Sequence, residues 1–316
     1  MDCLNEVLKT LHLKSSVSCR SELSAPWGLE FPHVPGHAGF SMVARGSCWL
    51  EMEGEKKQIA LAGGDFVMFP HGSVHVMRDA PGRKAVNVQK LLKSNNDNGN
   101  KSLSYGGGGA LTTLVCGCFE FEAGETNPLI SSLPAVIHIK GEEGRAVPWL
   151  ETTLQYLASE TASALPGAET VIGHLTDIIF IQAVRAYISS AGDCKKGLAK
   201  AITDPQIGQA LSLIHSAPQE PWTVASLALR AGMSRAGFAA RFRELVGEPP
   251  LQYLTRWRMH KAAGMLRAGP ESLGEIAGRI GYEAEAAFSK AFKRWAGHAP
   301  GAYRHSSRLA ATDSAR

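Results

Sequence analysis

The sequence lacks a continuous run of about eighteen uncharged apolar residues, which is the length that a helix needs to cross a bilayer. Its most apolar stretch, Val171 to Ile188, is interrupted by His174, Asp177 and Arg185. It also lacks a secretory signal at its beginning, because acidic residues fall among the first leucines in MDCLNEVLKT. We therefore expect a cytoplasmic protein that does not enter a membrane.

Cysteine is infrequent, with six residues in 316. In a cytoplasmic chain we expect these residues to be reduced thiols. The composition, 44% hydrophobic and 20% charged, is that of an ordinary globular protein and excludes a disordered or fibrous one. At roughly 150 residues per domain, the length predicts about two domains.

Charge is distributed unevenly along the chain. From residue 201 onward there are 15 Lys and Arg against 9 Asp and Glu, a net charge of +6. Residues 1–200 carry 18 against 20, a net charge of −2. A basic C-terminal third suggests that only this end meets a polyanion.

The first part of the chain combines helical and strand patterns. Leu4, Val7, Leu8 and Leu11 share one face of a possible helix. Short alternating apolar segments from about 38 to 90, separated by glycine and proline, predict a small antiparallel β-barrel or sandwich. Residues 93–109 predict a flexible loop within it, after which strand texture resumes at Leu111.

Two helical segments follow, at 148–164 and 168–190. The second has an apolar face, formed by Ile172, Leu175, Ile179, Ala183 and Ala186. Such a face must be buried. It can pack on its own domain or form a dimer interface, and the pattern does not decide between these.

The C-terminal third contains an internal repeat. Five residue types recur at a spacing of fifty, in the pairs Phe238 and Phe288, Phe242 and Phe292, Gly247 and Gly297, Pro250 and Pro300, and Tyr253 and Tyr303. Each copy has the anatomy of a helix-turn-helix, with Gly232 or Gly281 as the left-handed turn residue. Thr223, Ser234 and Ser272 are expected helix caps.

Helical geometry then separates a buried face from an outward face in each repeat. The phenylalanines are expected to be buried. The outward residues, which a recognition helix would place in the major groove, are Arg235, Ala236, Ala239, Ala240 and Arg243 in the first repeat, and Glu285, Ala286, Ser289, Lys290 and Lys293 in the second. Between the repeats, Arg256 and Arg258 are expected to contact phosphates, with the two recognition helices reaching major-groove faces roughly 34 Å apart.

These residues resemble a known family. Gly281-Tyr282-Glu283, the segment Phe288 to Arg294, and Gly297, Pro300 and Tyr303 are similar to the signature of AraC/XylS-type transcription regulators. The resemblance covers about residues 204–306, with the helix-turn-helix units at about 223–247 and 272–297. Ala284 departs from the family, which often has Ser there.

The N-terminal part resembles the cupin-type sensor domain found in one branch of that family. The resemblance rests on Trp27-Gly28, Gly46 to Trp49, Ala62 to Asp65, Pro70 to Gly72 and Leu114 to Phe121. The expected fold is therefore α+β: a cupin-like β-barrel at 1–140, a helical linker and dimerisation region at 141–203, an all-α DNA-binding domain at 204–306 and a flexible tail at 307–316. The resemblance implies a homodimer that binds double-stranded promoter DNA under the control of an effector. Such a regulator contacts RNA polymerase if it is an activator.

Three kinds of effector are compatible with the β-domain residues: a small organic molecule, a metal or an oxidant. Two histidines and two thiols, from His71, His75, Cys116 and Cys118, would suit Zn²⁺ or a similar divalent ion, and His37 and Cys19 could add to them. However, the first cupin motif reads Gly46-Ser-Cys48-Trp49 and lacks the histidine pair and acidic residue of a catalytic cupin metal centre.

Oxidation of the thiols is the second alternative. Cys116 and Cys118 are two residues apart on one strand, which puts their Cα atoms about 6.6 Å apart, near the upper limit for a disulfide. Cys19 or Cys48 is the better partner for either thiol. A small organic effector remains the default hypothesis.

Two other functions also fit parts of the chain. A metal-dependent cupin enzyme with a helical appendage would need the missing first-motif ligands. An architectural protein that binds DNA without sequence preference is suggested by the alanine-rich outward faces, although alanine can also read thymine methyl groups.

Overall fold

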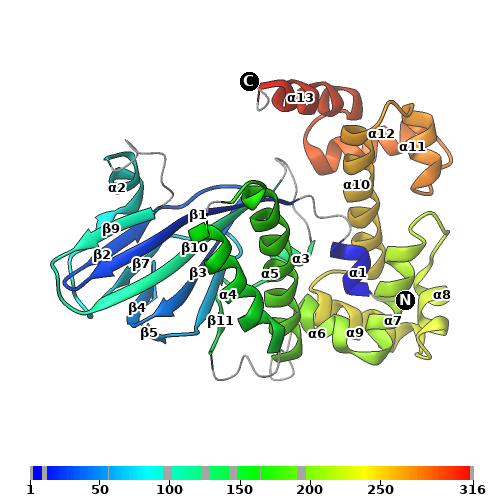
Figure 1. The fold of residues 1–316 in the computed structure, drawn as a ribbon. Coiled ribbons are helices and arrows are strands. Elements are labelled where there is room, and N and C mark those ends of the chain that lie inside the picture. The colour runs from blue at the N-terminus through cyan, green and yellow to red at the C-terminus, as the bar shows by residue number, and fades with distance from the viewer. Residues whose placement is uncertain are drawn as a thin grey trace. The chain divides into compact units, whose positions relative to one another are not determined.

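The computed structural model describes residues 3–8, 13–55, 57–94, 102–121, 128–141, 148–163, 165–190 and 197–313. The chain divides into two compact units (Figure 1). One, here called the β unit, consists of His12–Ala123 and Leu133–Ser190. The other, the helical unit, consists of Met1–Leu11, Gly124–Ser132 and Ala191–Arg316. The helices expected to link the domains therefore belong to the β unit as far as Ser190.

The β unit contains two sheets. Its strands are β1 (Leu13–Ser24), β2 (Gly28–Phe31), β3 (His37–Arg45), β4 (Ser47–Met52), β5 (Gln58–Ala62), β6 (Phe66–Phe69), β7 (His75–Arg78), β8 (Val86–Asn87), β9 (Ser102–Gly106), β10 (Leu111–Phe121) and β11 (Ile137–Ile139). The first sheet has the order β11-β6-β3-β10-β1-β9 and the second the order β5-β4-β7-β2-β8.

Buried apolar side chains from both sheets form one core. Leu23, Val43 and Leu114 enter it from the first sheet, and Leu50 and Met77 enter it from the second. The sheets therefore face each other as a sandwich. No closed barrel forms among the described strands, so the barrel expectation was too specific while the mixed α+β class is confirmed.

The loop expected at residues 93–109 contains a strand. β9 pairs in parallel with β1 from Ser102 to Gly106. Leu103 is completely buried in the core. Leu103 and the partly buried Tyr105 anchor an otherwise polar segment on the core, and local patterning does not reveal this. The short helix α2 (Val88–Ser94) comes before it.

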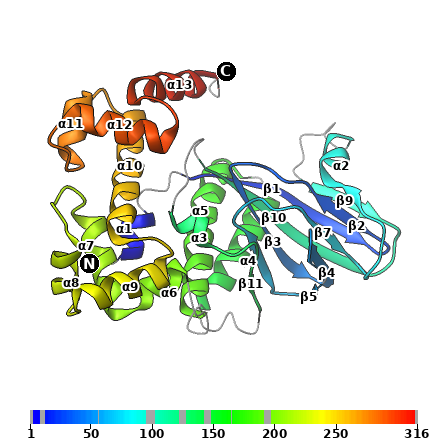
Figure 2. The same cartoon turned by 180° about the vertical axis from the view of Figure 1, so that it is seen from behind.

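Two long helices, α4 (Pro148–Ser163) and α5 (Ala168–Ser190), complete the β unit and lie side by side (Figures 1 and 2). Phe180 of α5 meets Phe119 and Phe121 of β10 edge-on, with ring centroids 5.1 and 6.2 Å apart. Helix α5 is apolar and long enough to cross a membrane by composition alone. Its buried Ile179, Phe180 and Ala183 give it instead the packing of a core helix on its own domain.

The helical unit begins with α1 (Cys3–Leu8), whose Leu4 and Val7 are buried where it packs on α7. Leu11, expected on the same face, lies outside the described residues. The other helices are α3 (Pro128–Ser132), α6 (Leu198–Thr203), α7 (Pro205–Ser216), α8 (Val224–Arg230), α9 (Arg235–Val246), α10 (Pro250–Ala268), α11 (Leu273–Arg279), α12 (Glu285–Ala296) and α13 (Pro300–Asp313). Helix α13 continues to Asp313, so the tail expected from residue 307 is helical over most of its length.

Asp204 links helices α7 and α9 of the helical unit. Its carboxylate caps α7 by accepting from the amides of Gln206 and Ile207, and it receives the guanidinium of Arg241 from α9 at 2.6 Å. Burial acts to raise the pKa of Asp204, but the Ile207 amide and Arg241 outweigh burial and lower it. Helices α7 and α9 are thus joined by a charge-assisted contact.

Both repeats form the predicted helix-turn-helix. Thr223 and Ser272 begin α8 and α11 with capping boxes. Gly232 and Gly281 occupy the turns at φ angles of 65° and 83°, a left-handed conformation that favours glycine. The predicted glycine turns and helix caps are therefore confirmed.

The buried faces also match the prediction. Phe238 and Phe242 of α9 and Phe288 and Phe292 of α12 are completely buried. The central helix α10 serves both repeats, since Tyr253 meets Phe242 at 5.8 Å between ring centroids, and Met259, Ala262, Ala263 and Leu266 pack with Phe288 and Phe292.

Helices α9 and α12 differ in their caps, and this difference predicts a stabilising substitution. Ser234 accepts the amide of Gly237 at the start of α9, whereas Ala284, at the equivalent position of α12, makes no side-chain cap. Ala284 already has the extended backbone of a cap residue, with φ −124° and ψ 130°. We expect Ala284→Ser to raise the free energy of unfolding by about 1 kcal/mol, as measured by urea unfolding. Ser234→Ala is the matched control and should lower it by a similar amount. An Ala284→Ser variant no more stable than the wild type would contradict this account.

Candidate nucleic-acid interface and ligand cavity

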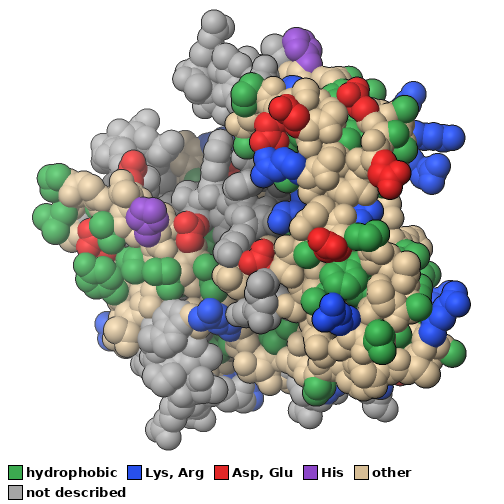
Figure 3. Space-filling view, turned by 90° about the vertical axis from the view of Figure 1, so that its right-hand side faces the viewer, with side chains coloured by type: hydrophobic (Ala, Val, Ile, Leu, Met, Phe, Trp, Pro, Cys, Tyr) green, Lys and Arg blue, Asp and Glu red, His purple; other side chains and the backbone are tan. Residues whose placement is uncertain are grey.

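The outward faces of α9 and α12 are open to solvent. On α9, Arg235, Ala236, Ala240 and Arg243 are exposed and Ala239 is half-buried. On α12, Glu285, Ala286, Lys290 and Lys293 are exposed and Ser289 is half-buried. Lys and Arg side chains stand out from the helical unit in Figure 3. Each helix thus presents small residues beside basic ones, a surface that can approach base edges closely.

Sequence reasoning omitted Arg294. It is exposed on α12 directly after Lys293. Arg294 follows Lys290 by four residues, so the two side chains are neighbours on the helix surface at the edge of the chosen face.

Arg256 and Arg258 of α10 both make contacts within the protein. Arg256 forms an ion pair with Glu248, with Nε 2.9 Å from Oε1, and lies over the Tyr253 ring. Arg258 donates from Nε to the Pro218 carbonyl at 2.7 Å and from Nη2 to the Glu220 carbonyl at 2.9 Å. These contacts give both arginines a structural role, and their expected phosphate contacts stay a prediction.

Arg258 joins the two repeats. Pro218 and Glu220 precede the first helix-turn-helix, and Gly281, whose carbonyl is 3.4 Å from Nη1 of Arg258, is the turn of the second. A side chain at Gly281 would place its Cβ 2.5 Å from the Gln219 carbonyl oxygen and 2.8 Å from Arg258 Nη2. Burial lowers the pKa of Arg258, but a guanidinium remains charged at neutral pH. Arg258 therefore connects the turn of the second repeat to the segment that precedes the first repeat.

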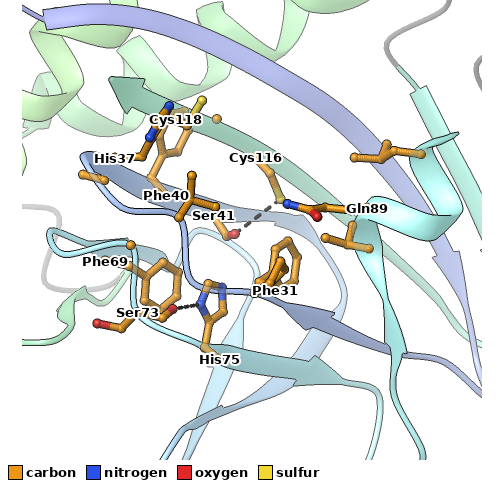
Figure 4. A pocket seen from close by; sticks show the side chains of 18 of the residues that line it. Phe31, His37, Phe40, Ser41, Phe69, Ser73, His75, Gln89, Cys116 and Cys118 are labelled. Atoms are coloured by element: carbon orange, nitrogen blue, oxygen red, sulfur yellow. Dashed lines mark hydrogen bonds between the residues drawn. The ribbon is translucent and has the colours of Figure 1, made fainter. Parts of the chain in front are cut away.

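The β unit contains a cavity of about 310 Å³ between β-strand residues and α2 (Figure 4). Phe31, Phe40, Phe69, Val88 and Leu92 supply much of its wall. Ser41 and Cys116 also line it and hydrogen-bond to each other, with Oγ and Sγ 3.3 Å apart. This volume is at the lower end of the range for small-molecule sites, roughly 300–1,000 Å³.

His75 is a buried polar residue of the cavity wall. Its ring lies between those of Phe31 and Phe69, with centroids 4.6 and 3.6 Å away. Nδ1 is 2.8 Å from the Ser73 carbonyl oxygen, whereas the buried Nε2 has no hydrogen-bond partner. Burial lowers the pKa of His75 to about 4. The imidazole is therefore neutral at physiological pH.

The suggested metal ligands are not brought together. No three His, Cys, Asp or Glu side chains in the described part of the chain lie close enough to hold a metal ion. His71 instead hydrogen-bonds through Nε2 to the Leu133 carbonyl at 2.9 Å. His37 hydrogen-bonds through Nδ1 to the Pro35 carbonyl at 3.0 Å. His71 is thus held by the segment around Leu133, whereas His75 lines the cavity.

The cysteines fall into two groups. Burial, followed by nearby Cys116 and Asp65, raises the pKa of Cys48 to about 12, so this thiol stays protonated and unreactive. Cys116 and Cys118 line the cavity from β10. The strand register sets Cys19 of β1 directly opposite Cys116. Cys48 is therefore a poor partner for a disulfide with Cys116 or Cys118.

Two family matches together span most of the chain. Residues 2–189 match a cupin family, and residues 227–306 match a helix-turn-helix domain family. A sensor-type β unit joined to two helix-turn-helix repeats defines a transcription regulator. More particularly, the chain belongs to the AraC-like transcription regulators, as its relatives show.

A putative AraC-like transcription regulator from Streptomyces lividans is 34% identical over 307 residues, covering 96% of this chain and 98% of the relative. The HTH-type transcriptional regulator AlkR from Acinetobacter baylyi is 31% identical over 317 residues, covering 97% and 100%. The crystallised DNA-binding domain of AdpA in complex with a target DNA is 36% identical, with a TM-score of 0.32, and covers 34% of this chain and 96% of that one.

The position of Arg258 predicts a structural effect on DNA binding. We expect Arg258→Ala to lower the stability of the helical unit by about 2–3 kcal/mol, because the Pro218 and Glu220 carbonyls lose charged donors. Operator affinity should fall while the slope of log affinity against log salt concentration stays unchanged, because no phosphate contact is lost. Fluorescence anisotropy between 50 and 200 mM salt measures both quantities. In the matched control, Arg243→Ala, the slope should decrease by about one if Arg243 meets a phosphate. A smaller slope of log affinity against log salt concentration in Arg258→Ala would show that Arg258 does contact a phosphate.

The low pKa of His75 predicts acid sensitivity. Between about pH 6.5 and pH 4 the unfolded chain binds a proton that the folded chain does not, so the free energy of unfolding decreases as the pH falls. We expect this contribution to reach about 3 kcal/mol at pH 4. The difference between wild type and His75→Phe in urea unfolding, measured from pH 7.5 to 4, isolates it, because the remaining groups titrate in both proteins. A difference that is independent of pH would show that His75 is not held neutral.

Proposed function

We propose that this AraC-like regulator reads promoter DNA with α9 and α12, each placed in the major groove. One observation carries the proposal. Both helices bury a phenylalanine pair against α10 and expose the opposite face, which combines small residues with Arg243 on α9 and Lys290 on α12. Small residues let the backbone approach the bases, and the basic residues can bind guanine or phosphate.

The β unit is the proposed sensor. Its cavity is lined largely by apolar side chains. The residues that line it come earlier in the sequence than the helices proposed to read DNA. A ligand that binds one conformation of this unit more tightly than another can shift promoter occupancy. The regulator is further proposed to be a cytoplasmic homodimer that contacts RNA polymerase if it activates transcription. The exposed Val171 and Ile178 of α5 are available for dimer contacts.

The competing functions are weaker. The relatives are transcription regulators, which suggests that the chain is not an enzyme. The described cavity residues also provide no three-ligand group for the metal of a cupin enzyme. An architectural role predicts equal affinity for all DNA sequences, so the ratio of specific to random-sequence affinity separates it from promoter recognition.

The proposal predicts the effects of two substitutions. Arg243→Ala and Lys290→Ala should each weaken binding to the preferred site by roughly 5- to 100-fold, through loss of base or phosphate contacts. The site can be selected from a randomised duplex pool with the wild-type protein, and affinities measured by anisotropy at one fixed salt concentration.

Arg83→Ala is the charge-matched control. Arg83 lies in the β unit and pairs with Asp79, so its removal should leave DNA affinity unchanged. Full affinity in both helix variants would refute the assigned groove-facing sides. A twofold or smaller preference for the selected site over random DNA would favour the architectural role.

A further inference from the structure

The hydrogen-bonding state of His75 specifies what its open nitrogen can accept. The Ser73 carbonyl oxygen can only accept a hydrogen bond, so Nδ1 of His75, 2.8 Å away, must carry the proton. A neutral imidazole has one N–H, and Nε2 is therefore left with a bare lone pair. Nε2 is an acceptor that needs a donor.

This acceptor is buried, and it belongs to a residue of the cavity wall. His75 lines the cavity and is only 6% exposed. Among the described cavity residues, Nε2 is the one buried side-chain nitrogen or oxygen without a hydrogen-bond partner. Figure 4 shows the ring held between Phe31 and Phe69, with the Ser73 hydrogen bond fixing its orientation. The ring cannot turn to satisfy Nε2 without giving up that hydrogen bond.

The walls restrict the charge of a ligand. No Asp, Glu, Lys or Arg side chain is among the described residues that line the cavity. An ionised carboxylate or ammonium would lose hydration there without gaining an Asp, Glu, Lys or Arg counterion, which is unfavourable. An uncharged hydroxyl or amide N–H loses much less and supplies the donor that Nε2 lacks.

We propose that the cavity of the β unit binds a neutral, largely apolar small molecule whose hydroxyl or N–H group donates a hydrogen bond to Nε2 of His75. This inference rests on the proposed sensor function and names the chemical class of its effector. Phe31, Phe40, Phe69 and Leu92 surround the apolar part of the ligand. His75 selects for the donor, because a ligand without one leaves Nε2 buried and unpaired.

Calorimetric titration of the full-length protein at pH 7.5 tests the selectivity. The probes are 1-hexanol, 1-octanol and 1-decanol, the methyl ether of each alcohol, and octanoate. The tightest alcohol is expected to bind roughly tenfold more tightly than its methyl ether, which retains the apolar chain but cannot donate. Octanoate should bind at least about a hundredfold more weakly than 1-octanol. The proposal is overturned if an ether or octanoate equals the alcohol, or if no alcohol of the series binds.

Substitution of His75 tests the role of Nε2. His75→Phe keeps an aromatic ring between Phe31 and Phe69 but removes the acceptor, so the preference for alcohol over ether should fall to about one while ether binding persists. His33→Phe is the matched control. The exposed His33 also hydrogen-bonds through Nδ1 to a backbone carbonyl but does not line the cavity, so the preference should remain. A preference that survives in His75→Phe refutes the role of His75. The wild-type series remains decisive if His75→Phe does not fold.

DNA binding by the same samples separates this inference from the proposed function. If the alcohols bind selectively but leave the affinity for the selected duplex unchanged, the ligand class stands and the coupling to DNA fails. If the protein does not prefer any duplex, the regulator proposal fails independently of calorimetry. If DNA recognition is intact and the ligand series shows no donor preference, the inference alone fails.

Discussion

The burial of Phe238 and Phe242 on α9, and of Phe288 and Phe292 on α12, is the interaction on which the proposed DNA-reading surface depends. A short helix that commits one face to a core must present its opposite face to solvent, and in both repeats that face carries small and basic residues. Because α10 supplies the packing partners of both pairs, the two recognition helices share one scaffold. The hydrophobic contacts thus orient side chains that do not themselves belong to the core.

Polar contacts refine this arrangement where apolar packing cannot. Asp204 fastens the beginning of α7 to α9 through Arg241, and Arg258 holds the turn of the second repeat against the segment preceding the first. A guanidinium satisfies several carbonyl groups in fixed directions, which a nonspecific apolar contact does not. Positive charge in this unit therefore has two roles. Exposed basic side chains are available to contact DNA, whereas Arg258 of α10 connects the two repeats.

The β unit follows a different physical principle. Its two sheets bury one continuous apolar core, yet a space remains beside the rings of Phe31, His75 and Phe69. A buried acceptor without a partner costs folding free energy, so its presence in an otherwise satisfied wall is informative. The same burial that keeps His75 uncharged makes the site selective between a neutral donor and an anion. A ligand that binds such a site in one conformation more tightly than in another converts a chemical signal into a change of conformation.

The sequence by itself determined the features that depend on local chemistry. The fifty-residue repeat, the glycine turns, the serine and threonine caps and the phenylalanine faces could all be read from spacing, because a helix fixes which residues share a face. Only the tertiary structure decided which residues far apart in the chain meet. Leu103 turned an expected loop into a strand, Arg258 proved to bind distant carbonyls, and His71 bonds the distant Leu133 carbonyl while His75 lines the cavity. Strand register and side-chain burial arise from long-range packing, which no local pattern encodes.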